Sequence, residues 1–129
     1  RVSARTGEWM VAEHGETMDL PLAIFFDTTA PPGEAFEAAV ERTASLLWES
    51  DRGGRQARLY SWERSFPDRG RLSLRAALGF LAEIAPRPTR PANRAEFERW
   101  RRDAAAGAGI FVTAGDPPEL PPGTLCRVA

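Results

Sequence analysis

Two aspartates and a threonine stand where an α/β protein could hold a metal ion. Asp27 directly follows the apolar run Leu20–Phe26, and Asp116 comes three residues after the apolar segment Gly109–Thr113. Both segments are expected to be strands, and open α/β sheets bind ligands beyond the carboxyl ends of their strands. Carboxylate and hydroxyl oxygens suit a hard cation such as Mg²⁺. We therefore name Asp27, Thr29 and Asp116 as candidate metal ligands.

Two other roles compete for Asp27. As a structural residue it would cap the helix that follows or hydrogen-bond the loop. As a catalytic residue it would work with Asp116 in a magnesium-dependent hydrolase. Hydrolases built on such a strand usually carry a second Asp two residues later, where this chain has Thr29, and the sequence lacks Lys, a GxxxxGK[ST] loop and a GxSxG-type serine. We therefore expect a protein that is not an enzyme, with no catalytic residues, and keep the hydrolase as the alternative.

The charge balance excludes several classes of partner. The 129 residues carry 17 basic side chains, all Arg, and 18 acidic ones, for a net charge of −1. A nucleic-acid-binding protein would show a basic excess, and so would a domain that attaches to anionic lipid. The longest apolar run, Leu20–Phe26, is far shorter than the roughly 20 residues of a membrane span. We expect no contact with nucleic acid or membrane.

The single cysteine allows no internal disulfide, which favours a reducing, cytoplasmic compartment. Because the chain begins with Arg1 rather than Met, we interpret it as a C-terminal fragment of a longer protein. That longer protein could carry upstream transmembrane helices as an anchor. Such helices would leave this domain in the cytoplasm.

Hydrophobic periodicity predicts one α/β domain over residues 1–129, in which residues 1–16 form an N-terminal extension. Strands alternate with helices, so we expect a mostly parallel sheet with helices on both faces. Asn93 with Glu96 has the spacing of a capping box for the third helix. The expected strands are Glu8–His14, Leu20–Phe26, Gln56–Trp62, Gly109–Thr113 and Leu125–Val128, with a turn or short edge strand in Glu63–Gly70; the expected helices are Glu34–Glu49, Leu72–Ile84 and Asn93–Ala106.

Three segments resemble a known bacterial family. They are SARTGEWMVAEH (Ser3–His14), the Asp27 strand with FEAAVERTASLL (Phe36–Leu47), and LRAALGFLAEIAP (Leu74–Pro86). Together they resemble the domain of unknown function 58 family, which has a von Willebrand factor type A-like, Rossmann-like fold. Type A domains hold a metal with a D-x-S-x-S motif. Asp27 and Thr29 match its first two ligands, but Pro31 replaces the last serine, so the resemblance implies a degenerate metal site with Asp116 as a further ligand.

The resemblance also implies a function. Members of this family are often encoded beside MoxR-type AAA+ ATPases, so we expect a non-catalytic adaptor that binds such an ATPase or another protein. We expect no resident cofactor apart from Mg²⁺ at the degenerate site. Thr28 and Trp100 are the candidate partner contacts. Trp100 has an alternative role. It forms an apolar stripe with Phe97, and this stripe could instead pack on the sheet.

Overall fold

The computed structural model describes residues 21–66, 71–115, 120 and 124–128. The N-terminal extension, with the strand expected at Glu8–His14, lies outside these residues, as does Asp116. Within the described residues the chain is an α/β fold with a mixed sheet and three helices. The α/β class expected from the sequence is confirmed.

The sheet has five strands in the order β3-β2-β1-β4-β5. β1 is central and pairs in parallel with β2 on one side and β4 on the other. β5 is parallel to β4, and β3 is a short antiparallel edge strand beside β2. The apolar run that ends in an aspartate therefore lies in the middle of the sheet, as expected. The strands are β1 (Leu22–Asp27), β2 (Ala57–Ser61), β3 (Ser65–Phe66), β4 (Ala108–Thr113) and β5 (Leu125–Val128).

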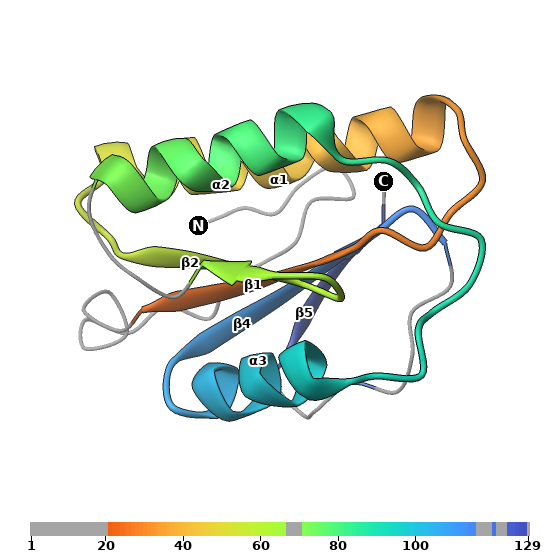
Figure 1. The fold of residues 1–129 in the computed structure, drawn as a ribbon. Helices are drawn as coiled ribbons and strands as arrows, with labels where there is room; N and C mark the ends of the chain where they lie inside the picture. The colour runs from red at the N-terminus through yellow and green to blue at the C-terminus, as the bar shows by residue number, and fades with distance from the viewer. Residues whose placement is uncertain (1–20, 67–70, 116–119, 121–123, 129) are drawn as a thin grey trace.

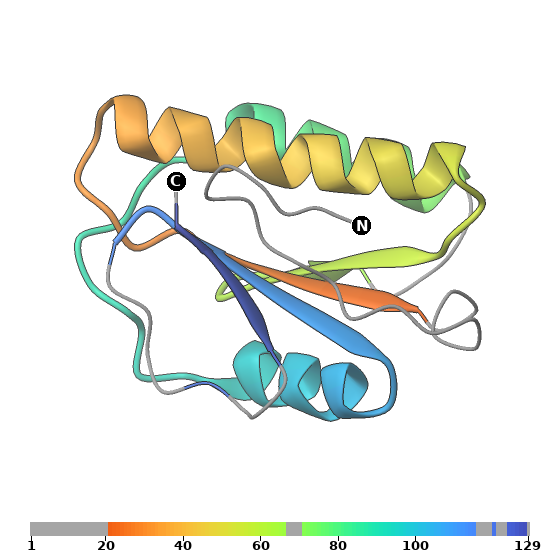
Figure 2. The same ribbon diagram turned by 180° about the vertical axis from the view of Figure 1, so that it is seen from behind.

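Helices cover both faces of the sheet. α1 (Glu34–Arg52) and α2 (Arg71–Glu83) lie side by side over one face, and α3 (Ala95–Ala105) lies under the other, as Figures 1 and 2 show. From β1 the chain moves to β2 in one direction and later to β4 in the other. Connections of one hand that run in opposite directions must use opposite faces. The positions of α1 and α3 obey that rule.

The continuous apolar sequence of β1 follows from this burial on two sides. Its alternate side chains point to opposite faces. Leu22, Ile24 and Phe26 join the core under α1 and α2, whereas Ala23 and Phe25 join a second core above α3. The second core is aromatic, because Phe25 contacts the rings of Trp62, Phe97, Trp100 and Phe111.

Two glycines are needed where they stand. Gly33, just before α1, has a φ of 144°, a conformation that is essentially confined to glycine. Gly109, at the start of β4, packs directly against α3. A Cβ there would stand 2.6 Å from the Cβ of Ala104, so any side chain at this position would push the helix off the sheet.

The start of α3 differs from the expected capping box. The N-cap residue is Arg94, with no side-chain cap, and Asn93 Oδ1 accepts a hydrogen bond of 2.9 Å from the N–H of Ala95. The Glu96 side chain does not return to the helix start. It instead accepts a hydrogen bond from Ser65 Oγ, which ties α3 to the edge strand β3. The contact with β3 thus replaces the capping-box hydrogen bond that the Glu96 side chain was expected to make.

No helix in the described part of the chain is both long and apolar enough to cross a membrane.

Candidate functional site

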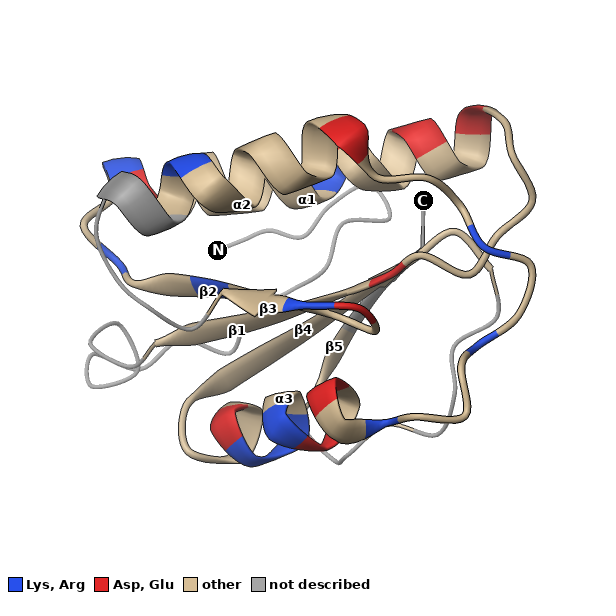
Figure 3. Cartoon of the chain, in the orientation of Figure 1, with Lys and Arg blue, Asp and Glu red and all other residues tan. Residues whose placement is uncertain are grey.

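The carboxyl ends of β1, β2 and β4 meet at one edge of the sheet. Four segments converge there: the β1–α1 loop, the β2–β3 turn, the linker between α2 and α3, and the residues after β4. Strand order changes direction between β1 and β4, and at such a point open α/β proteins form their binding crevices. In Figure 3 the linker carries basic residues past the acidic end of β1.

Asp27 is fully buried at this edge, with both carboxylate oxygens engaged. Oδ1 accepts hydrogen bonds from the Thr29 N–H at 3.0 Å and from Trp62 Nε1 at 2.8 Å. Oδ2 accepts from Arg90 Nη2 at 2.9 Å and from Thr113 Oγ1 at 3.0 Å. A carboxylate offers about four acceptor sites. All of them are used by donors from four different segments of the chain.

These contacts decide between the structural roles considered for Asp27. The N-cap of α1 is Gly33, which has no side-chain cap, so Asp27 does not cap the helix. It hydrogen-bonds the loop instead, through the N–H of Thr29. The carboxylate thereby fixes where the β1–α1 loop, the β2–β3 turn and the linker lie relative to β4.

The described residues do not fit a cation at Asp27. Its Oδ2 already faces the guanidinium of Arg90, and a metal ion beside that group would be repelled. Thr29 Oγ1 is buried without a hydrogen-bond partner among the described residues, but its backbone N–H, rather than its hydroxyl, meets Asp27. Within the same residues no group of three or more His, Cys, Asp or Glu side chains could hold a metal. Of the candidate ligands, Asp27 and Thr29 lie together, and Asp116 is outside the described residues.

A second carboxylate lies next to the first. Glu63 follows β2, and its Oε2 accepts a hydrogen bond from Arg87 Nη1 at 2.7 Å and a longer one from Thr28 Oγ1 at 3.4 Å. The backbone of Arg87 also joins the β1–α1 loop: its N–H donates to Thr28 O, and its carbonyl accepts from the Ala30 N–H, both at 3.0 Å. Arg87 stands between Pro86 and Pro88. The linker is therefore bound to the loop by both main chain and side chain.

Neither candidate partner contact is on the surface. Thr28 is fully buried, and its hydroxyl faces Glu63. Trp100 is fully buried as well, and its Nε1 donates a hydrogen bond of 2.9 Å to Ala23 O in β1. Trp100 thus packs on the sheet, the alternative role considered for it. Burial corrects the expectation that these two side chains contact a partner.

Tyr60 forms a separate buried network on the α3 face. Its hydroxyl donates a hydrogen bond to Asp103 Oδ2, which joins β2 to α3. Burial raises the pKa of Tyr60 above its ordinary value, and the Asp103 carboxylate raises it further, while Arg58 opposes the shift. The phenol is therefore held neutral, and its hydrogen bond connects β2 to α3.

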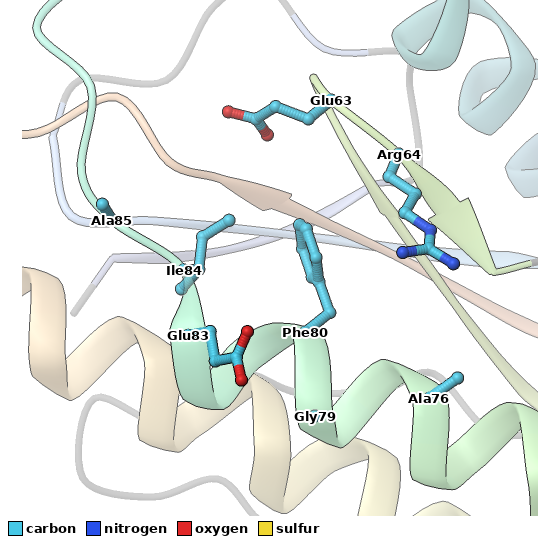
Figure 4. A pocket seen from close by; sticks show the side chains of 8 residues that line it. All are labelled: Glu63, Arg64, Ala76, Gly79, Phe80, Glu83, Ile84 and Ala85. Atoms are coloured by element: carbon cyan, nitrogen blue, oxygen red, sulfur yellow. The ribbon is translucent and has the colours of Figure 1, made fainter.

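A groove of about 630 Å³ opens beside Glu63, between the β2–β3 turn and α2. Figure 4 shows Phe80 of α2 and Ile84, the residue just after α2, pointing toward the turn where Glu63 and Arg64 lie. Arg64 stacks over the Phe66 ring at 4.6 Å. The lining residues are Glu63, Arg64, Ala76, Gly79, Phe80, Glu83, Ile84 and Ala85.

Sequence reasoning missed Trp62, Glu63, Arg87 and Arg90. A signal was present in the linker, where Arg87 and Arg90 alternate with three prolines. Proline stiffens a chain and removes backbone donors. Arginines held on such a segment indicate side chains with fixed positions rather than a solvated charge cluster.

Comparison with known proteins gives no significant match to a family model, to a curated protein or to a solved structure.

Proposed function

We propose that this chain is a non-catalytic, protein-binding domain of the von Willebrand factor type A-like kind, which acts as an adaptor for a partner protein. A MoxR-type AAA+ ATPase is the candidate partner, and such a partner would place the domain in the cytoplasm. The single observation that carries the proposal is the groove beside α2. It combines apolar and charged side chains in one concave surface beside the β2–β3 turn.

The groove favours a partner segment of defined chemistry. Phe80 and Ile84 are only partly buried and give the groove an apolar floor. Glu83 is exposed and forms no ion pair with any described residue, so its charge is available to a partner. An apolar side chain flanked by Arg or Lys would match this floor and rim.

Three features of the fold support the type A assignment. A central strand that ends in an aspartate, parallel neighbours on both sides and helices on both faces are features that the resembled family also has. The function of an α/β fold must still be argued from its site. The proposal therefore depends on the groove and not on the topology.

The contacts of Asp27 favour the adaptor over the magnesium-dependent hydrolase. A catalytic carboxylate must reach its substrate or its metal ion. Asp27 is fully buried, and internal donors use both of its oxygens. A nucleophile held in this way would first have to lose Arg90 and Trp62.

Gly79 offers a sharp test. It is exposed in α2, and no atom lies within 4 Å of where its Cβ would stand, so a side chain there enters the groove without disturbing the fold. Gly79→Arg should weaken binding of the full chain to the ATPase about tenfold or more, equivalent to about 1.4 kcal/mol. Gly79→Ala is the matched control. It should bind as the wild type does and be more stable by up to about 1 kcal/mol, because Ala favours helix.

A charge reversal at Glu83 tests the charged rim of the groove separately from its apolar floor. Glu83→Lys should weaken the same complex, and Glu41→Lys, on the exposed face of α1, should not. Dissociation constants measured by calorimetry, with and without nucleotide, decide the result. Equal binding of wild type and Gly79→Arg would remove the groove from the proposal. No complex with the wild-type protein under either condition would remove the adaptor function itself.

A further inference from the structure

We infer that Arg90 is a built-in counter-ion: its guanidinium supplies, from within the chain, the positive charge that a metal ion supplies at this edge of a type A domain. Among the described residues, the Asp27 carboxylate then has its charge balanced and its acceptor sites filled without a divalent cation. This inference does not depend on the proposed function, because it concerns how Asp27 is neutralised and holds whichever partner binds.

Burial makes a positive partner for Asp27 necessary. A carboxylate with no exposed surface needs a cation and hydrogen-bond donors to offset the loss of water. Arg90 lies 2.9 Å from Oδ2, and its side chain keeps 27% of its surface exposed. Arg does not lose its proton in proteins, so the charge it brings is permanent. The pair therefore meets the requirement without any other ion.

The orientation of Thr113 supports the same conclusion. Its Oγ1 accepts a hydrogen bond of 3.0 Å from the Gly115 N–H and lies 3.0 Å from Asp27 Oδ2. Because a carboxylate only accepts, the hydroxyl proton must point at Asp27. Thr113 is therefore a hydrogen-bond donor to the same carboxylate oxygen that Arg90 meets, and the two together offset the loss of water at Oδ2.

The backbone around Arg90 explains how the side chain reaches Asp27. The linker residue Arg87 is bound to Thr28 and Ala30 in the loop that directly follows Asp27. Arg90 lies three residues further along the same segment, just before Pro91. The main-chain attachment at Arg87 thus fixes the position from which the guanidinium extends to the carboxylate.

The experiment compares metal binding with stability in the full chain. Mg²⁺ and Mn²⁺ are titrated into the wild-type protein by calorimetry, and thermal unfolding is followed with the metal and with EDTA. We expect no saturable heat and an unchanged Tm. Arg90→Met should lower the Tm by roughly 10 °C or more, because the buried carboxylate loses its counter-ion. Arg90→Lys, which keeps the charge, should recover part of the loss.

Arg87→Met is the control, since it removes an arginine from the same linker but leaves Asp27 paired; its Tm should change far less. Saturable Mn²⁺ binding by the wild type that Asp27→Asn abolishes would overturn the inference. A Tm of Arg90→Met equal to that of the wild type would overturn it too. Should Arg90→Met fail to fold, the wild-type titration and Arg90→Lys still decide, because a Lys variant less stable than Arg87→Met is the expected order.

Discussion

Two carboxylates at neighbouring strand ends, each paired with an arginine from the same linker, form a natural comparison. Asp27 ends β1 and pairs with Arg90 at 2.9 Å, and Glu63 follows β2 and pairs with Arg87 at 2.7 Å. By distance the second pair is the closer one. By burial they are opposites, because the Asp27 side chain has 0% exposure and the Glu63 side chain has 35%.

Burial, and not contact distance, sets how much each of these ion pairs contributes to stability. A partly exposed ion pair such as Glu63 with Arg87 gains little, since water and salt screen it and two long side chains lose freedom. A buried carboxylate cannot return to water when a partner is removed, so each lost partner carries a large penalty. The contacts of Asp27 should therefore govern stability, while Glu63, which is paired with Arg87 and borders the groove, should contribute little.

The largest effect should come from removing the buried carboxylate. Asp27→Ala leaves Arg90, Trp62 and Thr113 with donors that have lost their acceptor, and should cost about 3–5 kcal/mol of unfolding free energy. Urea unfolding followed by circular dichroism measures the loss. Glu63→Ala is the matched truncation and should cost less than about 1 kcal/mol. Similar losses for the two variants would show that burial does not set the contribution of each carboxylate.

Removing a single donor from Asp27 should have an intermediate effect. Trp62→Phe keeps an aromatic ring near Phe25 and Phe97 but deletes the N–H that meets Oδ1. A hydrogen bond to a charged group is worth about 1.5–3 kcal/mol, and we expect a loss in that range. Trp48→Phe, at a side chain with 49% exposure, is the control and should leave the unfolding free energy unchanged. A harmless Trp62→Phe would mean that the carboxylate does not need all four donors.

Tyr60 tests the effect of burial on a side chain that is uncharged in the folded protein. Its pKa is raised above the ordinary value of about 10, so the folded state keeps a proton that the unfolded chain releases. The stabilisation that comes from retaining this proton is fully present below about pH 10. It is lost as the pH rises further, by up to about 1.4 kcal/mol per pH unit, until the raised folded pKa is passed.

The measurement for Tyr60 is direct, because the chain has one tyrosine. Tyrosinate absorbance of the folded protein should remain low past pH 10 and rise abruptly on unfolding. Tyr60→Phe should remove this contribution to the alkaline loss of stability. A native-state titration near pH 10 would show that the hydroxyl is open to solvent.

The smallest effect should come from Glu63→Gln. It removes the charge that faces Arg87 but keeps an acceptor, and should change the unfolding free energy by less than about 1 kcal/mol. The difference from wild type should vanish in about 1 M salt, where exposed charges are screened within about 3 Å. The loss in Asp27→Ala should persist there, because its pair is buried. A salt-sensitive Asp27→Ala would contradict the distinction between the two carboxylates.

Much of the fold could be predicted from local pattern. The uninterrupted apolar run of β1 indicates a strand buried on both faces, and its central position confirms this. The helix expected at Glu34–Glu49 is observed at Glu34–Arg52, and the edge strand expected within Glu63–Gly70 is the short β3. These elements are set by periodicity and by glycine, which act over a few residues.

The site could be predicted only in part. An aspartate at the end of a buried strand indicates a polar centre at the carboxyl edge of the sheet, and Asp27 is there. Which donors meet it depends on the three-dimensional path of the linker, since Arg90 is 63 residues away in sequence. The same limit explains the error at Glu96: its local spacing fits a capping box, but Ser65, 31 residues away, binds the carboxylate instead.

The prolines on either side of Arg87 have a consequence for insertions and deletions. Arg87 gives its N–H to Thr28 O, and the residues before and after it, Pro86 and Pro88, have none to give. If the linker slid by one residue in either direction, a proline would face that carbonyl and leave it unbonded inside the protein. Only one register of the linker against the β1–α1 loop therefore satisfies the carbonyl of Thr28. An insertion or deletion between α2 and Arg87 must be accommodated before Pro86, because the linker cannot shift along the loop.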